Sequence, residues 1–372
     1  MLDFELIKKG GQNGEGAVFS IKTQKGTKIY GLPTRNHYND DVDLGPTWNY
    51  LIVTDDLTLV DTGRWGEGKR LLRMIEDLGY NPRHLNQVVV THGHDDHDGG
   101  LSELMAGTNA RLLAHETYAR LKDYYPDAII PSEANPHFPA SCWHCEMPQS
   151  FWSVHCLDYH RERSSLTVHE AIIDGLTLKD GGITFYHVPG HSPDSLAMMV
   201  DSEVLICGDV LLPEITPHPT LERHYRLTRE VLPDRYADEN VLYGLRVYIK
   251  SIKRLCRLMN PDVMILPGHR LYTAGKWNRV YLEQRADEIV QHHLDRCESI
   301  LSLISEGKST LDIIVKSHFD ESMLKGTGNM LAREEIFSHL ELLHNAGDIR
   351  SINNGNLVRT GTTGFEGLIR SL

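Results

Sequence analysis

A run of imidazole and carboxylate side chains at residues 91–100 is the part of the sequence best suited to chemistry. It reads Thr-His-Gly-His-Asp-Asp-His-Asp-Gly-Gly, so His92, His94, Asp96 and His97 fall within six positions. Two imidazoles spaced two residues apart in an extended turn can converge on one metal ion, while Asp96 and His97 face a second. Imidazole and carboxylate groups suit zinc, iron or manganese. The run therefore predicts a metal site.

Three further ligand types each follow a predicted strand and stand next to a glycine. His191 lies in Pro-Gly-His, Asp209 in Cys-Gly-Asp and His269 in Pro-Gly-His. Side chains just beyond strand ends lie where α/β sheets usually place their functional sites. With the run at 91–100, they supply enough ligands for two metal ions.

The elements that must position these residues alternate between strands and helices. Apolar runs bounded by turns predict strands at residues 48–53, 57–60, 88–90, 111–114, 183–188, 196–200, 204–207 and 262–266. Helical spacing predicts helices at 71–78 and 239–259. Glycines before residue 45 predict β-hairpins, and the proline-rich segment 117–180 predicts a long insertion or lid. Strand-helix alternation on both sides of that segment favours an α/β sandwich.

Residues 281–372 have a different pattern, which predicts helices near 289–304, 311–315 and 336–343, followed by a hairpin at 349–358. Three helices and a hairpin are typical of a small winged-helix module. This part contains nine Lys and Arg residues and fourteen Asp and Glu residues, so its net charge is negative. Because a helix that reads DNA is expected to be basic, we expect this part to pack against the catalytic domain or to form a homodimer contact.

The ordered set of ligands resembles the metallo-β-lactamase superfamily over residues 10–280. The set is Asp61, then His92-x-His94-x-Asp96-His97, then His191, Asp209 and His269. The resemblance implies a four-layer αββα sandwich at residues 1–280 and a small winged-helix-like domain at 281–372. It also implies that His92, His94 and His191 bind one metal, that Asp96, His97 and His269 bind the other, that Asp209 bridges them, and that Asp61 orients ligands by hydrogen bonding.

The chemistry expected of such a centre is hydrolysis. Water shared by two divalent ions loses a proton more easily, and the resulting hydroxide attacks a carbonyl carbon or phosphorus. Zinc is the expected metal, with iron or manganese as alternatives, and Asp96 or Asp209 could carry the proton. We expect a small-molecule substrate with an ester-type bond, a thioester or a lactone. The C-terminal part resembles a branch that includes glyoxalase-II-like thioesterases and β-lactamase-like endoribonucleases. A metal-dependent endoribonuclease is therefore the alternative, followed by an iron oxidoreductase and a non-catalytic binding protein.

Composition limits the other choices. A net charge of −13 disfavours a polyanionic partner, and no apolar run approaches the ~20 residues of a membrane helix. The acidic N-terminal residues lack a secretory pattern, so we expect a cytoplasmic protein. Packed thiols are favoured over an accessory zinc site for Cys142, His144, Cys145, His155 and Cys156, and Cys207 is expected in the core. A solvated loop is favoured over pocket lining for His218, His224, Tyr225 and Arg226.

Overall fold

An eight-stranded sheet forms one half of the main body in the computed structural model, which describes residues 2–36, 44–124, 156–178, 182–352 and 355–372. Its strands follow one another in chain order, antiparallel from β1 to β5 and parallel from β5 to β8. They are β1 (Asp3–Lys8), β2 (Val18–Lys22), β3 (Lys28–Thr34), β4 (Thr47–Val53), β5 (Leu57–Val60), β6 (Leu85–Val89), β7 (Arg111–His115) and β8 (Glu170–Ile172). The expected hairpins before residue 45 are the β1-β2-β3 meander.

A four-stranded sheet in the order β12-β11-β10-β9 forms the other half. Its strands are β9 (Ile183–His187), β10 (Leu196–Val200), β11 (Val204–Gly208) and β12 (Met264–Pro267). β9, β10 and β11 are antiparallel neighbours, whereas β12 is parallel to β11. The strands β13 (Tyr272–Thr273) and β14 (Lys276–Trp277) form a separate small hairpin.

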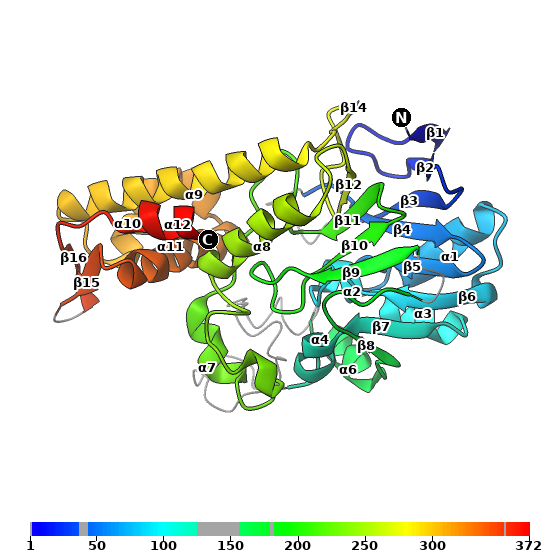
Figure 1. Cartoon of the computed structure of the whole chain (residues 1–372), viewed down its shortest axis with the longest axis horizontal. Helices are drawn as coiled ribbons and strands as arrows, with labels where there is room; N and C mark the ends of the chain where they lie inside the picture. Colours follow the sequence, from blue (N-terminus) through cyan, green and yellow to red (C-terminus); the bar gives the residue numbers. More distant parts are fainter. Residues whose placement is uncertain (1, 37–43, 125–155, 179–181, 353–354) are drawn as a thin grey trace.

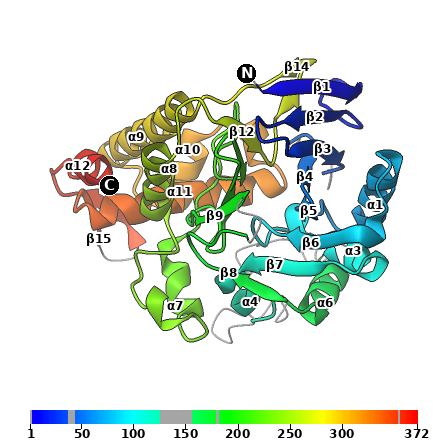
Figure 2. The same cartoon turned by 45° about the vertical axis from the view of Figure 1, so that its right-hand side comes forward.

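Helices cover the outer faces of the two sheets, so the sandwich has four layers (Figures 1 and 2). α1 (Gly68–Asp77) and α3 (Leu101–Gly107) lie on the eight-stranded sheet, and α8 (Leu245–Leu258) lies on the four-stranded sheet. This is the predicted α/β sandwich. The helix expected at 239–259 begins only at Leu245, because Gly244 has a φ of 97° that a helix does not accommodate.

The alternation of side chains along buried strands produces three hydrophobic layers. In β11, Val204 and Ile206 pack between the two sheets, while Leu205 and Cys207 pack against the helices on the other side. In the eight-stranded sheet, Val89 faces the space between the sheets. Because both faces of these strands are covered, their sequences are continuous apolar runs.

The C-terminal residues are mainly helical and share a hydrophobic core with the four-stranded sheet. They form α9 (Leu282–Ser305), α10 (Leu311–His318), α11 (Thr327–Asn345), the strand pair β15 (Ile349–Ser351) and β16 (Leu357–Arg359), and an unexpected α12 (Phe365–Ser371). Side chains of α9 and α11 lie in one cluster with Leu205 and Tyr248. The winged-helix assignment and a domain boundary at residue 280 stay predictions.

The described part of segment 117–180 is joined to the sandwich. It contains most of α4 (Glu116–Leu121), all of α6 (Leu157–Ser165), and β8, which pairs with β7 at the edge of the sheet. A lid role stays a prediction, and residues 125–155 lie outside the described part. Among the described residues, no helix combines the length and apolar character that crossing a membrane requires.

Candidate metal centre

The loop after β6 carries the first ligand types. It continues through Thr91 into the short helix α2 (Asp95–Asp98), with His92 and His97 buried and His94 and Asp96 half-buried. Gly99 permits a close approach to the loop after β5, because a Cβ there would lie 2.1 Å from the backbone nitrogen of Trp65. The loop is thus packed tightly against the loop after β5, whereas its side chains His94 and Asp96 are partly exposed to solvent.

The remaining ligand types come from the ends of strands in the four-stranded sheet. His191 follows β9, Asp209 follows β11 and His269 follows β12. The backbone nitrogen of Leu196 donates to the oxygen of Thr91 at 2.8 Å and so joins this sheet to the loop after β6. The edges of the two sheets therefore meet, and all seven side chains named by the sequence are brought together there.

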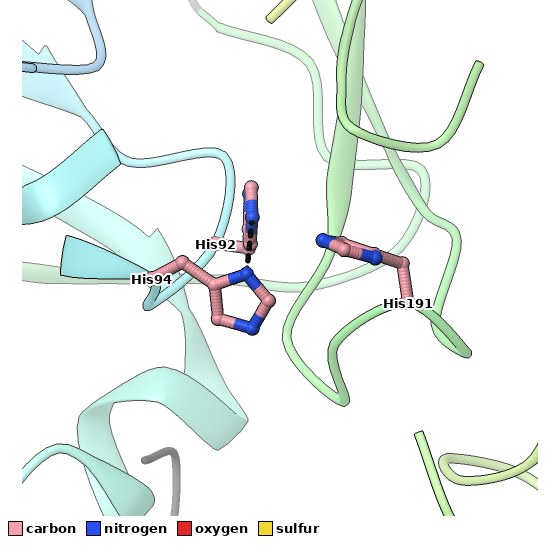
Figure 3. A group of neighbouring side chains, drawn as sticks. All are labelled: His92, His94 and His191. Carbon is pink, nitrogen blue, oxygen red and sulfur yellow. Dashed lines mark hydrogen bonds between the residues drawn. The ribbon is translucent and has the colours of Figure 1, made fainter. Parts of the chain in front are cut away.

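Three overlapping groups of ligand atoms result, and within each group all atoms lie within 4.8 Å of one another. They are His92, His94 and His191; His92, His97 and Asp209; and Asp96, His97 and His269. The rings of the first group come from two separate loops and point toward one another (Figure 3). In that group His92 Nε2 lies 3.1 Å from His94 Nδ1.

Asp209 lies between the first and the last of these groups. Its Oδ2 is 3.8 Å from His191 Nε2 and 3.4 Å from His269 Nε2, and its Oδ1 is 3.4 Å from His97 Nε2. His269 Nε2 is also 3.0 Å from Asp96 Oδ2. Asp209 therefore lies within reach of residues from both groups.

In four of the histidine rings, Nδ1 forms a hydrogen bond with an oxygen atom, so that the other ring nitrogen, Nε2, is directed toward the centre. The contacts to Nδ1 are Thr91 Oγ1 to His92 at 3.1 Å, Asp61 Oδ2 to His97 at 2.8 Å, the His218 oxygen to His191 at 2.7 Å, and the Pro46 oxygen to His269 at 3.3 Å. Histidines that bind metals are usually held in this way. Within the described part of the chain, His191 Nε2 and Asp209 Oδ1 are buried without a hydrogen-bond partner. These residues fit divalent metal ions.

Gly268 keeps the space beside this centre open. A Cβ on Gly268 would lie 2.4 Å from Asp209 Oδ1 and 2.7 Å from His97 Cε1. Its oxygen accepts a hydrogen bond of 2.8 Å from the backbone nitrogen of Trp48, which fixes the loop after β12 to the eight-stranded sheet. The Pro-Gly-His sequence thus allows close approach of the backbone to the ligands.

The pKa values of the ligand residues show how imidazole and carboxylate charges balance one another in the site. Burial alone lowers the pKa of His97, but Asp209 and other carboxylates raise it well above 6.5. The pKa of His269 is lowered by burial and raised by Asp209 and Asp96, with a net rise to about 9. For Asp96, burial raises the pKa, but His97 and His269 bring it below its usual range. Protons on two imidazoles therefore balance the carboxylates, and a divalent ion would replace them.

Asp61 lies beneath the loop and has no direct place among the inner ligand atoms. Its Oδ1 accepts from the Thr91 nitrogen at 2.7 Å, and its Oδ2 accepts from Thr91 Oγ1 and His97 Nδ1, each at 2.8 Å. The residue has a positive φ of 60°, which is unusual for a residue with a side chain. Asp61 thus orients one ligand and the backbone that carries the others.

A buried network that no sequence pattern predicted supports the same loop. Arg163 of α6 donates to the oxygen of Gly93 and to Asp98 Oδ2, each at 3.0 Å. Tyr118 donates to Asp98 Oδ2 at 2.9 Å, and Tyr159 donates to Asp98 Oδ1 at 2.5 Å. Asn36 also went unnoticed, and its Nδ2 donates to Asp96 Oδ2 at 3.0 Å. In the sequence, only Asp98, which directly follows His97, indicates this network, because Arg163 is distant in sequence.

The solvated loop expected for His218, His224, Tyr225 and Arg226 is wrong for His224 and Tyr225, which are buried. His218 adjoins the centre through its backbone oxygen. Arg226 lines a cavity of about 710 Å³ beside α11, and none of the seven residues of the metal centre is in its lining. Cys207 is fully buried in the core, as expected. Cys156 precedes α6, whereas Cys142, His144, Cys145 and His155 lie outside the described residues.

A family model described as "Metallo-beta-lactamase superfamily" matches residues 42–269. The chain belongs to this superfamily. Among solved structures, a metallo-beta-lactamase family protein from Thermus thermophilus is 24% identical, with a TM-score of 0.62 over 89% of this chain and 98% of that one. A beta-lactamase domain protein from Burkholderia ambifaria is 22% identical, with a TM-score of 0.65 over 96% and 97%. Both show the metallo-β-lactamase fold.

Curated relatives of this metallo-β-lactamase superfamily chain include lactonases. An N-acyl homoserine lactonase from Bacillus thuringiensis is 25% identical over 247 residues, which are 59% of this chain and 79% of the relative. An N-acyl homoserine lactonase from Bacillus sp. is 24% identical over 251 residues, or 60% and 81%. Together with the ligand groups, this similarity supports a metal-dependent hydrolase.

Proposed function

We propose that the protein is a hydrolase with two divalent metal ions that opens the ring of a small lactone. The observation that carries this proposal is the position of Asp209 between two groups of three ligand types, one formed by histidines and the other containing Asp96. When bound, divalent ions in such a pair supply an activated water and polarise the substrate carbonyl. Zinc is the metal we favour, because the donors are imidazoles and carboxylates.

The exposure of the ligands defines the side from which substrate enters. His92, His97 and His269 are fully buried, whereas His94, Asp96 and His191 are half-buried. A substrate carbonyl therefore approaches between the loops that carry His94 and His191. The buried rings on the far side hold the geometry and exclude bulk water.

Asp96 is the side chain best placed to move a proton. One of its oxygens, Oδ2, contacts both Asn36 Nδ2 and His269 Nε2 at 3.0 Å, which holds the carboxylate at the open edge of the centre. Water adds to the lactone carbonyl carbon, and the ring C–O bond breaks. The proton that leaves the water is carried by Asp96 to the alkoxide oxygen, and the product is a hydroxy acid.

A lactone is favoured over the alternatives by two observations. The curated relatives are N-acyl homoserine lactonases, although their identity to this chain is low. The net charge of −13 is unfavourable for RNA, whose binding depends on neutralised phosphates. A thioester is the second choice within the same chemistry, because the attacked atom is again a carbonyl carbon.

The test combines metal analysis with a substrate panel. Zinc-loaded wild type should open acyl homoserine lactones faster than it cleaves a thioester or RNA. Asp209→Ala should lose metal and lower kcat/KM by more than about a hundredfold. Asp77→Ala, which removes an exposed carboxylate at the end of α1, is the matched control and should behave as wild type.

Other outcomes would overturn the proposal in distinct ways. Turnover of the thioester without the lactone would change the substrate, and RNA cleavage would change the class. A single bound iron with oxygen consumption would replace hydrolysis by oxidation. No turnover of any substrate by the fully loaded protein would favour a binding role.

A further inference from the structure

A second group of side chains that could bind a metal lies between two C-terminal helices and includes none of the seven residues above. His293 belongs to α9, and Glu335 and His339 belong to α11 one helical turn apart. His293 and His339 are fully buried and Glu335 is almost so. One ligand atom from each residue lies within 4.8 Å of the other two. Metal sites in helical bundles are built from facing helices in this manner.

The distances resemble those of the main centre. His293 Nδ1 lies 3.0 Å from His339 Nε2, compared with 3.1 Å between His92 and His94. Glu335 Oε1 is 3.9 Å from His293 Nδ1. Two ligands that each lie 2.0–2.1 Å from a tetrahedral zinc ion are about 3.3 Å apart, so small movements would complete the geometry.

A hydrogen bond to the backbone orients the ring of His339 so that Nε2 can bind a metal ion. Its Nδ1 donates to the backbone oxygen of Glu335 at 2.6 Å, so the lone pair is on Nε2, the atom that faces His293. Burial lowers the pKa of His339 to about 4 and that of His293 well below 6.5, which keeps both rings neutral. Neutral imidazole is the form that binds metal.

The cluster has buried nitrogen atoms that its hydrogen bonds do not use. Nε2 of His293 and Nε2 of the neighbouring His218 have no hydrogen-bond partner among the residues that the structure describes. Buried polar atoms normally have partners, so the unpartnered Nε2 of His218 is a nitrogen that an ion in this cluster could use. His218 Nε2 lies 3.9 Å from Glu335 Oε2, so it adjoins the same cluster.

The ion pair between Arg296 and Glu335 offers an alternative explanation of this cluster. Arg296 Nη1 contacts Glu335 Oε1, and this ion pair already balances the carboxylate. With Arg296 in place, the two rings could simply share a hydrogen bond. An ion would instead convert the two facing nitrogens, His293 Nδ1 and His339 Nε2, together with a carboxylate oxygen of Glu335 into a ligand set. The ion pair would then hold the carboxylate in position.

We propose that His293, Glu335 and His339 form a further binding position for a divalent transition-metal ion of the zinc class, which ties α9 to α11. Two imidazoles and one carboxylate are a ligand set that zinc accepts, with a fourth position left for water or His218. This position adjoins the main centre, because the backbone oxygen of His218 holds His191 Nδ1. The proposal does not depend on the substrate or on the activity of the main centre.

Zinc content of the full-length protein tests this proposal. After equilibration with buffered zinc, wild type should carry about one equivalent more than His339→Gln or His293→Gln. His344→Gln, an exposed histidine on the same helix, is the matched control and should retain the wild-type content. In an Asp209→Ala background, which weakens the main centre, about one equivalent should persist and should disappear when His339→Gln is added. Equal content in wild type and His339→Gln would overturn the proposal.

A measurement on wild type covers the case in which the buried substitutions prevent folding. Crystals grown with zinc should give an anomalous difference peak at the zinc edge between His293 and His339, in addition to peaks in the main centre. Absence of that peak at saturating zinc would show that the rings share only a hydrogen bond.

Discussion

Replacing Asp98 with asparagine should lower the free energy of unfolding by about 3–5 kcal/mol, because it leaves a buried guanidinium without its counter-charge. The Arg163 and Asp98 side chains are 1% and 0% exposed. Burial raises the pKa of Asp98, and the charge of Arg163 opposes this rise. Loss of one partner is the costly event.

The magnitude can be expressed as a melting temperature. The entropy of unfolding is about 2.1 cal/mol/K per residue, so for 372 residues a loss of about 4 kcal/mol corresponds to a fall of about 5 °C. The first group of ligands should also weaken, because Arg163 holds the oxygen of Gly93 between His92 and His94. Zinc affinity should therefore fall together with stability.

Urea unfolding and zinc competition with a chelator measure the two effects. Arg161→Met is the matched control, since Arg161 lies on the same helix in an exposed ion pair with Asp158 and should cost less than about 1 kcal/mol. The double variant Asp98→Asn with Arg163→Met should recover part of the loss, because no unpaired charge remains. A loss below about 1 kcal/mol for Asp98→Asn, or simple additivity in the double variant, would refute the reasoning.

Asp61→Asn should weaken metal binding about 10–100-fold by releasing the ring of His97, as measured by competition with a chelator; unchanged affinity would contradict this role. Zinc loading at pH 7 should release about two protons, from His97 and His269, when titration heats are compared in buffers of different ionisation enthalpy. In the ion-free protein, the stability from protonated His269 is complete below pH 6.5 and is lost as pH rises through about 9, so a melting temperature that rises across this range would oppose the assignment. Gly268→Ala should abolish zinc binding, because its Cβ would meet a carboxylate oxygen at 2.4 Å, whereas Gly367→Ala, where nothing lies within 4 Å, should bind as wild type.

The sequence indicates the ligands well because their order and their position after strands follow directly from the chain. The run of His92, His94 and His97 is local, and Asp209 directly follows a strand that is apolar on both faces. Period-two and continuous apolar patterns place such strands within a residue or two. For the same reason, β10 begins and ends where its apolar run does.

The supporting residues could not be found in this way, because their partners are distant and have no local pattern. Arg163 reaches Gly93 from a helix near the end of the proline-rich segment 117–180, and its basic side chain looks like an ordinary surface residue in the sequence. His218 acts on His191 through a backbone oxygen, which no residue type reveals. The cluster around His293 likewise depends on the packing of α9 against α11, which helical periodicity alone does not specify.

The hydrophobic cluster shared by the four-stranded sheet and the C-terminal helices determines when the chain can complete its folding. Leu205 and Tyr248 pack in the same cluster as Ile336 and Ile369, near the end of the chain. Contacts so distant in sequence form slowly, because the loops that they close cost entropy first. During synthesis, part of the apolar surface of this cluster therefore stays exposed until the helices that carry Ile336 and Ile369 have been made. We expect the nascent chain to depend on chaperones until then.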